Sequence, residues 1–226
     1  NVRLPRTLLA LAVGATLAQC GAVMQGLFRN PLADPGIIGV SSGAALGAAL
    51  CIVLFPQGGE YLVAFSAFSA GLFTTLMVYR LASSVSGTSV VLLLLSGVAV
   101  AALAGAGIGL LTYMASDMAL RDLTLWQMGS IAGAQWHYVI LSLVALALLS
   151  WQFTQSANAL NALLLGEAEA RHLGVNVDKL KRKLIVLCAV GVGIAVAATG
   201  IIGFIGLVVP HLVRMLIGPD HKLLLP

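Results

Sequence analysis

Charge is what this chain has least of. Only 9% of its 226 residues are Asp, Glu, Lys or Arg, whereas a soluble domain carries about a quarter. Apolar residues make up 60% of the chain, and the mean hydropathy is +1.03. Because so few charged side chains cannot cover the surface of a water-soluble fold, this composition indicates an integral membrane protein.

The motifs of common enzyme classes are also missing. The sequence has no GxxxxGK[ST] phosphate loop, no HExxH, no paired-cysteine site and no G-x-S-x-G elbow. The three cysteines stand alone in apolar runs, which is typical of buried free thiols. Four scattered histidines favour interfacial or hydrogen-bonded roles over metal or haem ligation; they are His137, His172, His211 and His221. We therefore expect no catalytic residue, no metal site and no cofactor bound by this chain.

Apolar runs of about 20 residues can cross the hydrocarbon core of a bilayer as helices. Six such runs are present, at residues 7–28, 37–55, 61–79, 90–114, 137–153 and 184–209. No charged residue lies near the middle of any run, which counts against an ion-coupled carrier or pump. Alternating barrel-type strands are absent, so the sequence predicts an all-α integral membrane fold, a polytopic helical bundle.

Small residues recur at spacings that let helix backbones approach closely. The glycines in these patterns are Gly39, Gly43 and Gly47, then Gly105 and Gly109, and finally Gly200, Gly203 and Gly206. The pattern predicts tight helix contacts within a compact bundle, with a moving seam as the alternative.

The segment LLLGEAEARHLGVNVDKLKRK, residues 163–183, holds eight of the charged side chains in a chain with 12 Lys or Arg and 8 Asp or Glu. If the N-terminal end is outside, the inner loops carry Arg29, Arg80, Arg171, Lys179, Lys181, Arg182 and Lys183. The outer basic residues are then Arg3, Arg6, Arg121, Arg214 and Lys222. Basic residues favour cytoplasmic loops, so residues 154–183 are predicted to be cytoplasmic.

Within this segment the pattern predicts two short helices, the first ending at Gly166 and the second at Gly174. Glu167 and Arg171 are four residues apart and are expected to pair on one helical face. Asn176 is expected to cap the helix that follows. The apolar stripe favours docking to another protein, whereas residues 179–183 favour a basic anchor at the lipid headgroups.

Residues 115–136 are expected to form a short helix on the outer side, capped by Asp117. Three methionines and a tryptophan lie in or beside it and would suit a flat, apolar cargo, although the same side chains can simply pack the mouth of a pathway. They are Met114, Met118, Trp126 and Met128.

Four stretches are similar to one known family. They are RLPRT from residue 3, GAVMQGLFRNPLADPGIIGVSSGAALG from residue 21, LGEAEARHLG from residue 165, and GIIGFIGLVVPHLVR with DHKLLLP between residues 200 and 226. Together they resemble the permease subunits of bacterial ABC importers for ferric siderophores, haem and vitamin B12, of the FecCD type. The resemblance implies a multi-pass inner-membrane protein with the type II ABC importer permease fold. Such a permease has about ten transmembrane helices, of which six are expected in this fragment.

The resemblance also implies partners and site residues. A second permease copy would complete a homodimer, two ATPase subunits would hold ATP and Mg²⁺, and a periplasmic binding protein would deliver the cargo; no nucleic acid is expected. ATPase coupling falls on Leu165, Gly166, Glu167, Ala170, Arg171, Leu173 and Gly174, and binding-protein docking on Arg3 and Arg6. A cytoplasmic gate falls on Ser86, Thr88 and Ser89.

The segment LRDLTLWQMGSIAGAQW, residues 120–136, resembles haem permeases more than permeases for the other cargoes. We therefore expect haem, with ferric siderophore or vitamin B12 as alternatives. An ATPase-independent carrier or channel is the distant alternative.

Overall fold

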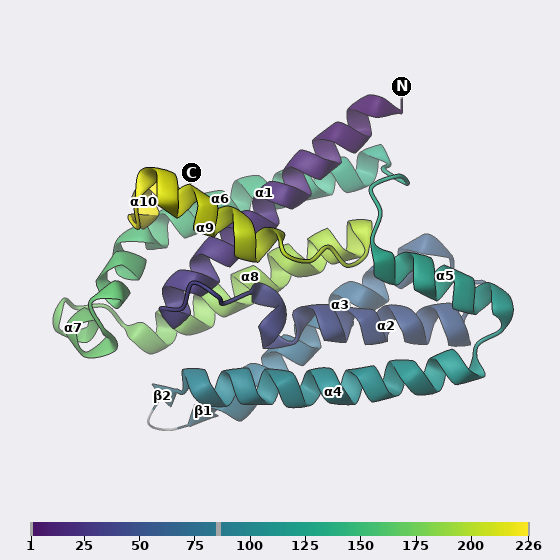
Figure 1. The fold of residues 1–226 in the computed structure, drawn as a ribbon, viewed down its shortest axis with the longest axis horizontal. Coiled ribbons are helices and arrows are strands. Elements are labelled where there is room, and N and C mark those ends of the chain that lie inside the picture. The colour runs from purple at the N-terminus through teal and green to yellow at the C-terminus, as the bar shows by residue number, and fades with distance from the viewer. Residues whose placement is uncertain (1, 85–86, 226) are drawn as a thin grey trace.

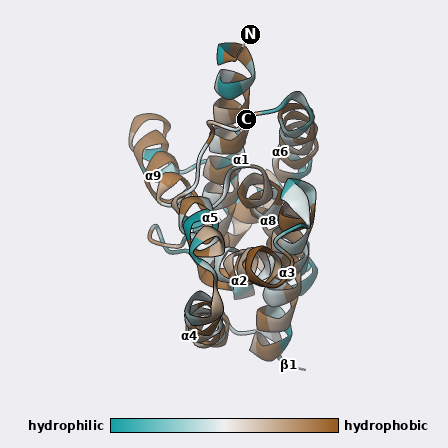
Figure 2. Cartoon of the chain, turned by 90° about the vertical axis from the view of Figure 1, so that its right-hand side faces the viewer, coloured by the Kyte–Doolittle hydropathy of each residue, from teal (hydrophilic) through white to brown (hydrophobic). Residues whose placement is uncertain are grey.

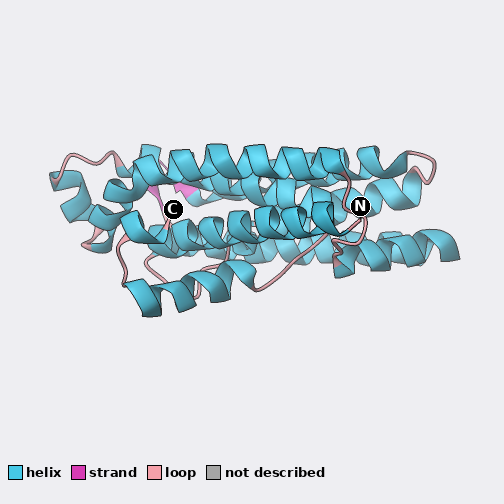
Figure 3. Ribbon diagram, turned by 90° about the horizontal axis from the view of Figure 1, so that it is seen from above, coloured by secondary structure: helices cyan, strands magenta, loops and turns pink. Residues whose placement is uncertain are grey.

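Long helices that run along a common axis make up most of the molecule (Figures 1 and 3). The computed structural model describes residues 2–84 and 87–225. The elements are α1 (Arg3–Phe28), η1 (Pro35–Ile38), α2 (Val40–Leu54), α3 (Gly59–Ala82), β1 (Ser83–Ser84), β2 (Gly87–Thr88), α4 (Val90–Met114), α5 (Asp117–Met128), α6 (Trp136–Leu164), α7 (Glu167–His172), α8 (Val177–Thr199), α9 (Ile205–Ile217) and α10 (His221–Leu224). Apart from the two-residue antiparallel ladder of β1 and β2, the described elements are helices, which confirms the all-α prediction.

Five of these helices, α1, α3, α4, α6 and α8, are long and apolar enough to cross a membrane. The second expected span is shorter than predicted. Its helix α2 has 15 residues, or about 22 Å at 1.5 Å per residue. Pro35 begins the preceding 3₁₀ helix, Asp34 caps it, and Gly39 at φ 86° separates it from α2. The backbone turn at Gly39 therefore divides a run that its apolar composition predicts as one helix.

The sixth expected span, residues 184–209, is wrong as a single helix. Helix α8 ends at Thr199, and Gly200 and Phe204 both have positive φ, at 72° and 67°. The backbone here lies against α5: a Cβ on Gly200 would collide with the carbonyl of Trp126. The close approach requires glycine and a non-helical turn. The helix therefore ends here, and the chain becomes helical again as α9.

Helices α1 and α8 form the centre of the bundle. Their apolar windows are 61% and 56% buried, compared with 22% for α3 and α4. Cys20 of α1 and Cys188 of α8 face each other, and each thiol contacts the other residue's carbonyl, at 4.0 and 3.8 Å. All three cysteines are buried and free, which confirms their interpretation from sequence.

The glycine patterns are only partly helix contacts. Gly43 and Gly47 pack against α3, where a Cβ on either would collide with Thr74 or with Ser66 and Ala70. In contrast, a Cβ on Gly105 or Gly109 would meet nothing within 4 Å among the described residues. The first pattern confirms the packing prediction, whereas the second faces outward.

The bundle has two ends (Figure 1), and Figure 2 shows the end with α5 facing the viewer. We call them the α7 end, which holds α7, the β1–β2 ladder and α10, and the α5 end, which holds the N-terminus and α5. The predicted outer position of Arg214 and Lys222 is wrong, because the break after α8 lets α9 and α10 return beside the last turns of α1 and α6. All Lys and Arg residues except Arg3, Arg6 and Arg121 therefore lie toward the α7 end.

Candidate functional site

The charged segment folds as a turn and one short helix. The first of the two predicted short helices is the final part of α6, which runs unbroken to Leu164. Gly166, at φ 124°, makes the turn into α7. On α7 Ala170 is fully buried, whereas Leu165 and Leu173 on either side of the helix are 69% and 64% exposed. The structure therefore presents two apolar side chains and the open Gly174 turn on the surface of the α7 end.

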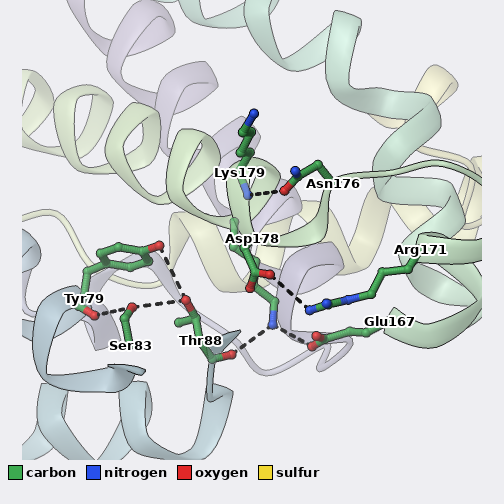
Figure 4. A network of polar contacts seen from close by, with 9 residues as sticks. Tyr79, Ser83, Thr88, Glu167, Arg171, Asn176, Asp178 and Lys179 are labelled. Atoms are coloured by element: carbon green, nitrogen blue, oxygen red, sulfur yellow. Dashed lines mark hydrogen bonds and ion pairs between the residues drawn. The ribbon is translucent and has the colours of Figure 1, made fainter. Parts of the chain in front are cut away.

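The expected Glu167–Arg171 ion pair is not formed. Arg171 Nη2 instead lies 3.1 Å from Asp178 Oδ2, and Glu167 Oε1 accepts a hydrogen bond from Lys181 Nζ at 2.6 Å (Figure 4). Pairing within one turn was expected because the two residues are four apart, but two partners on α8 compete successfully. Asn176 caps α8 by accepting from the Lys179 amide at 3.1 Å, as predicted.

Lys181 overturns the interpretation of residues 179–183 as a uniform headgroup anchor. Its side chain is 3% exposed, whereas Lys179, Arg182 and Lys183 are exposed. The Lys181 ammonium also donates to the carbonyl of Thr88 at 3.0 Å. A buried ammonium needs a carboxylate and further acceptors to offset its lost hydration, and Glu167 and Thr88 supply both.

The α3–α4 connection is held by hydroxyl groups. The Ser83 hydroxyl donates to the Tyr79 carbonyl at 2.7 Å and lies 3.1 Å from the Thr88 hydroxyl, which also lies 3.5 Å from the Tyr79 phenol oxygen. Ser89 caps α4 by accepting from the Leu92 amide. Thr88 and Ser89 of the predicted gate are therefore structured, while Ser86 lies outside the described residues.

At the α5 end, Arg3 and Arg6 are exposed on the first turn of α1. Arg6 Nε donates to the carbonyl of Ala132 at 2.9 Å, which ties α1 to the segment between α5 and α6. Arg3 and the remaining donors of Arg6 thus point to a surface that a partner can reach from water.

Helix α5 forms as expected, but its cap is Ser116 and not Asp117. The Ser116 hydroxyl accepts from the Ala119 amide at 3.3 Å, and Asp117 occupies the first turn. Beside α5 lies a cleft of about 520 Å³ whose lining includes Met118, Trp126, Glu60 and Asp122. Its volume lies within the roughly 300–1,000 Å³ typical of small-molecule sites.

The structure brings together only part of the expected cargo set. Met118 and Trp126 line the cleft, Met128 lines a smaller cavity of about 350 Å³, and Met114 lines neither. Met114, Met118 and Met128 are all more than 60% exposed. The helical order of α5 explains the division, because residues 118 and 128 lie on different faces.

A partly buried polar cluster escaped the sequence reasoning. Arg214 donates to the Gln25 side chain at 2.5 Å and to the Ala22 carbonyl at 3.2 Å. Asn161 Nδ2 donates to Asp220 at 2.6 Å, and Asn161 Oδ1 accepts from the backbone amide of His221. The only signal in the sequence is that several amide and charged side chains flank apolar runs. Their meeting depends on the turn after α8, which brings α9 and α10 back to α1 and α6.

His221 is fully buried within this cluster. Its Nδ1 lies 2.9 Å from Asn161 Oδ1, which confirms a hydrogen-bonded histidine there. Burial and the nearby Arg214 charge lower the pKa of His221 to about 4, against an opposing effect of Asp220. The imidazole is therefore neutral at physiological pH and acts as part of the packing of α10 against α1 and α6.

Comparison with known proteins assigns the whole chain to one family. The family model described as the FecCD transport family matches residues 1–226. Over its full length the chain is 48% identical to the hemin transport system permease protein HmuU of Yersinia pestis and 45% identical to the cobalamin import system permease protein BtuC of Halobacterium salinarum. It is 42% identical to the vitamin B12 import system permease protein BtuC of Vibrio cholerae. The chain spans 69%, 61% and 68% of these relatives, respectively.

A solved structure gives the same answer for the fold. It is an inward-facing conformation of an ABC transporter assigned to the metal-chelate type, and it matches with a TM-score of 0.92 and 40% sequence identity. The match covers 100% of this chain and 71% of that chain.

Proposed function

Because this chain belongs to the FecCD transport family, we propose that it forms the pathway by which an ATP-driven importer carries haem across the bacterial inner membrane. The chain is a multi-pass membrane permease of the ABC importer class, a transport component and not an enzyme. The observation that carries the class is the family match over the entire chain. The cargo and the partners are our proposal.

The α7 surface is the proposed contact with the ATPase subunits. Leu165 and Leu173 are exposed apolar side chains on either side of a helix with Glu169, Arg171 and His172 exposed. Exposed apolar side chains rimmed by polar residues are typical of a protein contact. Two ATPase subunits would hold ATP and Mg²⁺. Each would press on α7 of one copy in a permease homodimer.

The charge distribution supports a cytoplasmic α7 end. With Arg214 and Lys222 at this end, the basic residues are divided more unequally than the sequence alone indicated, and basic loops favour the cytoplasm. Arg3 and Arg6 would then face the periplasm, where they can meet acidic residues of a cargo-binding protein. Each exposed ion pair of this kind contributes about 0.2–1 kcal/mol, so several must act together.

Haem is the preferred cargo for two reasons. The segment LRDLTLWQMGSIAGAQW resembles haem permeases, and the hemin permease of Yersinia pestis shares 48% identity with this chain. Met118 and Trp126 offer the cleft beside α5 a polarizable, apolar wall. The carboxylates of Glu60 and Asp122 also line it, so the acidic groups of a haem would have to point away from them. Vitamin B12 and ferric siderophore are the alternatives.

Uptake by the full-length permease in liposomes, reconstituted with its ATPase, tests the proposal. Purified binding protein is preloaded with haem, vitamin B12 or a ferric siderophore and added outside the liposomes. Uptake is measured with and without ATP inside the liposomes. A catalytically inactive ATPase serves as the matched control.

ATP-dependent uptake of haem alone would support both the importer and the cargo. Uptake of another cargo would retain the importer and replace haem. Cargo movement that is equal without ATP, or with the inactive ATPase, would overturn the importer mechanism.

A further inference from the structure

We propose that Lys181 is a positioning residue that joins α7 to the α3–α4 connection, so that a displacement of α7 is passed to the backbone at Thr88. This inference rests on the proposed function, because it requires a partner that moves α7. It assigns the transmission of that movement to one buried side chain.

The geometry of the ammonium group carries the inference. Lys181 extends from the first half of α8 and bonds in two directions, to Glu167 on α7 at 2.6 Å and to the Thr88 carbonyl on β2 at 3.0 Å. These partners are 14 and 93 residues away in sequence. In Figure 4 the two contacts are the dashed lines that meet between Thr88 and Glu167. Because the second acceptor is a backbone atom, a pull on the ammonium acts on the chain itself.

Because Lys181 is buried, water cannot easily replace either of its two acceptors. With only 3% of its side chain exposed, the Lys181 ammonium has little water to replace either acceptor. A shift of α7 that separates Glu167 from the ammonium leaves a charge without compensation. The lower-energy response is for Lys181 and its second partner to move together with α7.

The movement has a defined route beyond Thr88. The Thr88 hydroxyl contacts Ser83, whose own hydroxyl is bonded to the carbonyl of Tyr79 in the last turns of α3. The Ser89 amide donates to the Ala82 carbonyl at 3.1 Å, and Ser89 caps α4. A displacement at Thr88 therefore reaches the end of α3 and the start of α4.

The second ion pair of the segment provides a contrast. The Arg171 and Asp178 side chains are 52% and 43% exposed, so water can replace either partner. Both residues also lie within the α7–α8 segment, and neither bonds to the described part of the α3–α4 connection.

The test uses the full-length permease in lipid nanodiscs with its ATPase and compares nucleotide-free complex with complex trapped by ATP and vanadate. Hydrogen exchange is measured in peptides covering residues 165–174 and 83–92. The variants are Lys181→Met, Glu167→Gln and the neutral pair Glu167→Gln with Lys181→Met. Lys179→Met is the matched control, because Lys179 is an exposed lysine two residues away on the same helix.

In the unmodified complex we expect trapping to change exchange in both peptides. Lys181→Met should keep the change at residues 165–174 and reduce the change at residues 83–92 at least fivefold, whereas Lys179→Met should alter neither. The neutral pair should recover the stability of the unmodified protein without recovering the response at residues 83–92. That combination separates transmission from a merely structural role.

The inference is overturned if Lys181→Met responds normally at residues 83–92, if the unmodified complex shows no response there, or if the neutral pair restores the response. Loss of the response at residues 165–174 in Lys181→Met would also overturn it, by reducing Lys181 to a support for docking. An unmodified complex with no ATPase-dependent change at residues 165–174 would instead contradict the proposed function.

Discussion

The two ion pairs near α7 should differ strongly in their contribution to stability. Glu167→Ala removes the only carboxylate that the structure places on Lys181 within the described residues. Loss of one partner from a buried pair costs about 3–5 kcal/mol. Because Glu167 is itself 36% exposed and the Thr88 carbonyl remains bonded to Lys181, we expect a value near the lower limit, about 3 kcal/mol.

Asp178→Ala provides the comparison. It breaks a pair whose side chains are 52% and 43% exposed, and exposed pairs contribute about 0.2–1 kcal/mol. Replacement of both Glu167 and Lys181 by Gln and Met should lie within about 1 kcal/mol of the unmodified protein, because no buried charge is then left unpaired.

Reversible unfolding of the full-length permease in mixed micelles, with increasing SDS, measures these differences. The free energies of unfolding should rank the unmodified protein and the neutral pair together, Asp178→Ala slightly below them, and Glu167→Ala well below. A loss of less than 1 kcal/mol for Glu167→Ala, or an equal loss for Asp178→Ala, would refute the argument that burial distinguishes the two pairs.

Three further outcomes are expected. Gly97→Ala should lower the yield of folded protein, because its Cβ would collide with the carbonyl of Ile37. Gly105→Ala should not, because a Cβ there meets no described atom within 4 Å. Size-exclusion profiles in detergent compare the two variants. Stability should fall as the pH drops from about 6.5 toward 4. The exposed imidazole of an unfolded chain binds a proton at a higher pH than the folded His221, whose pKa is about 4. Between pH 7.5 and 5, the unfolding temperature of His221→Gln should therefore depend less on pH than that of the unmodified protein. A maleimide reagent should label the three buried cysteines only after denaturation, and rapid labelling of the native protein would contradict their burial.

Apolar run length and the motif order were sufficient to predict the fold class. The all-α membrane bundle, the short helix after α4 and the cap at Asn176 follow from local rules, and the structure bears them out. The single span over residues 184–209 failed for a physical reason that lies elsewhere in the chain. Gly200 turns there because α5 approaches its backbone, and a hydropathy window cannot register that contact.

The pairing of charges was predicted less well than the position of the charged segment. A spacing of four residues correctly places Glu167 and Arg171 on one short helix, but the energy of an exposed pair in a helix is only about 0.2–0.5 kcal/mol. The burial of Lys181 imposes a much larger requirement for a carboxylate. That requirement selects Glu167, and Arg171 then pairs with Asp178. The burial of one lysine among four neighbouring basic residues is a tertiary fact that local spacing does not contain.

The segment's charge therefore has two separate physical roles. The exposed residues Lys179, Arg182 and Lys183 can bias the orientation of the bundle through the distribution of positive charge. Lys181 contributes the same formal charge, yet its side chain is withdrawn from water and joins three segments of the chain. Neutralising an exposed lysine should thus affect orientation or lipid contact, whereas neutralising Lys181 should affect the link between α7 and the α3–α4 connection. The sequence pattern KLKRK makes these lysines look equivalent, and only the burial of Lys181 separates them.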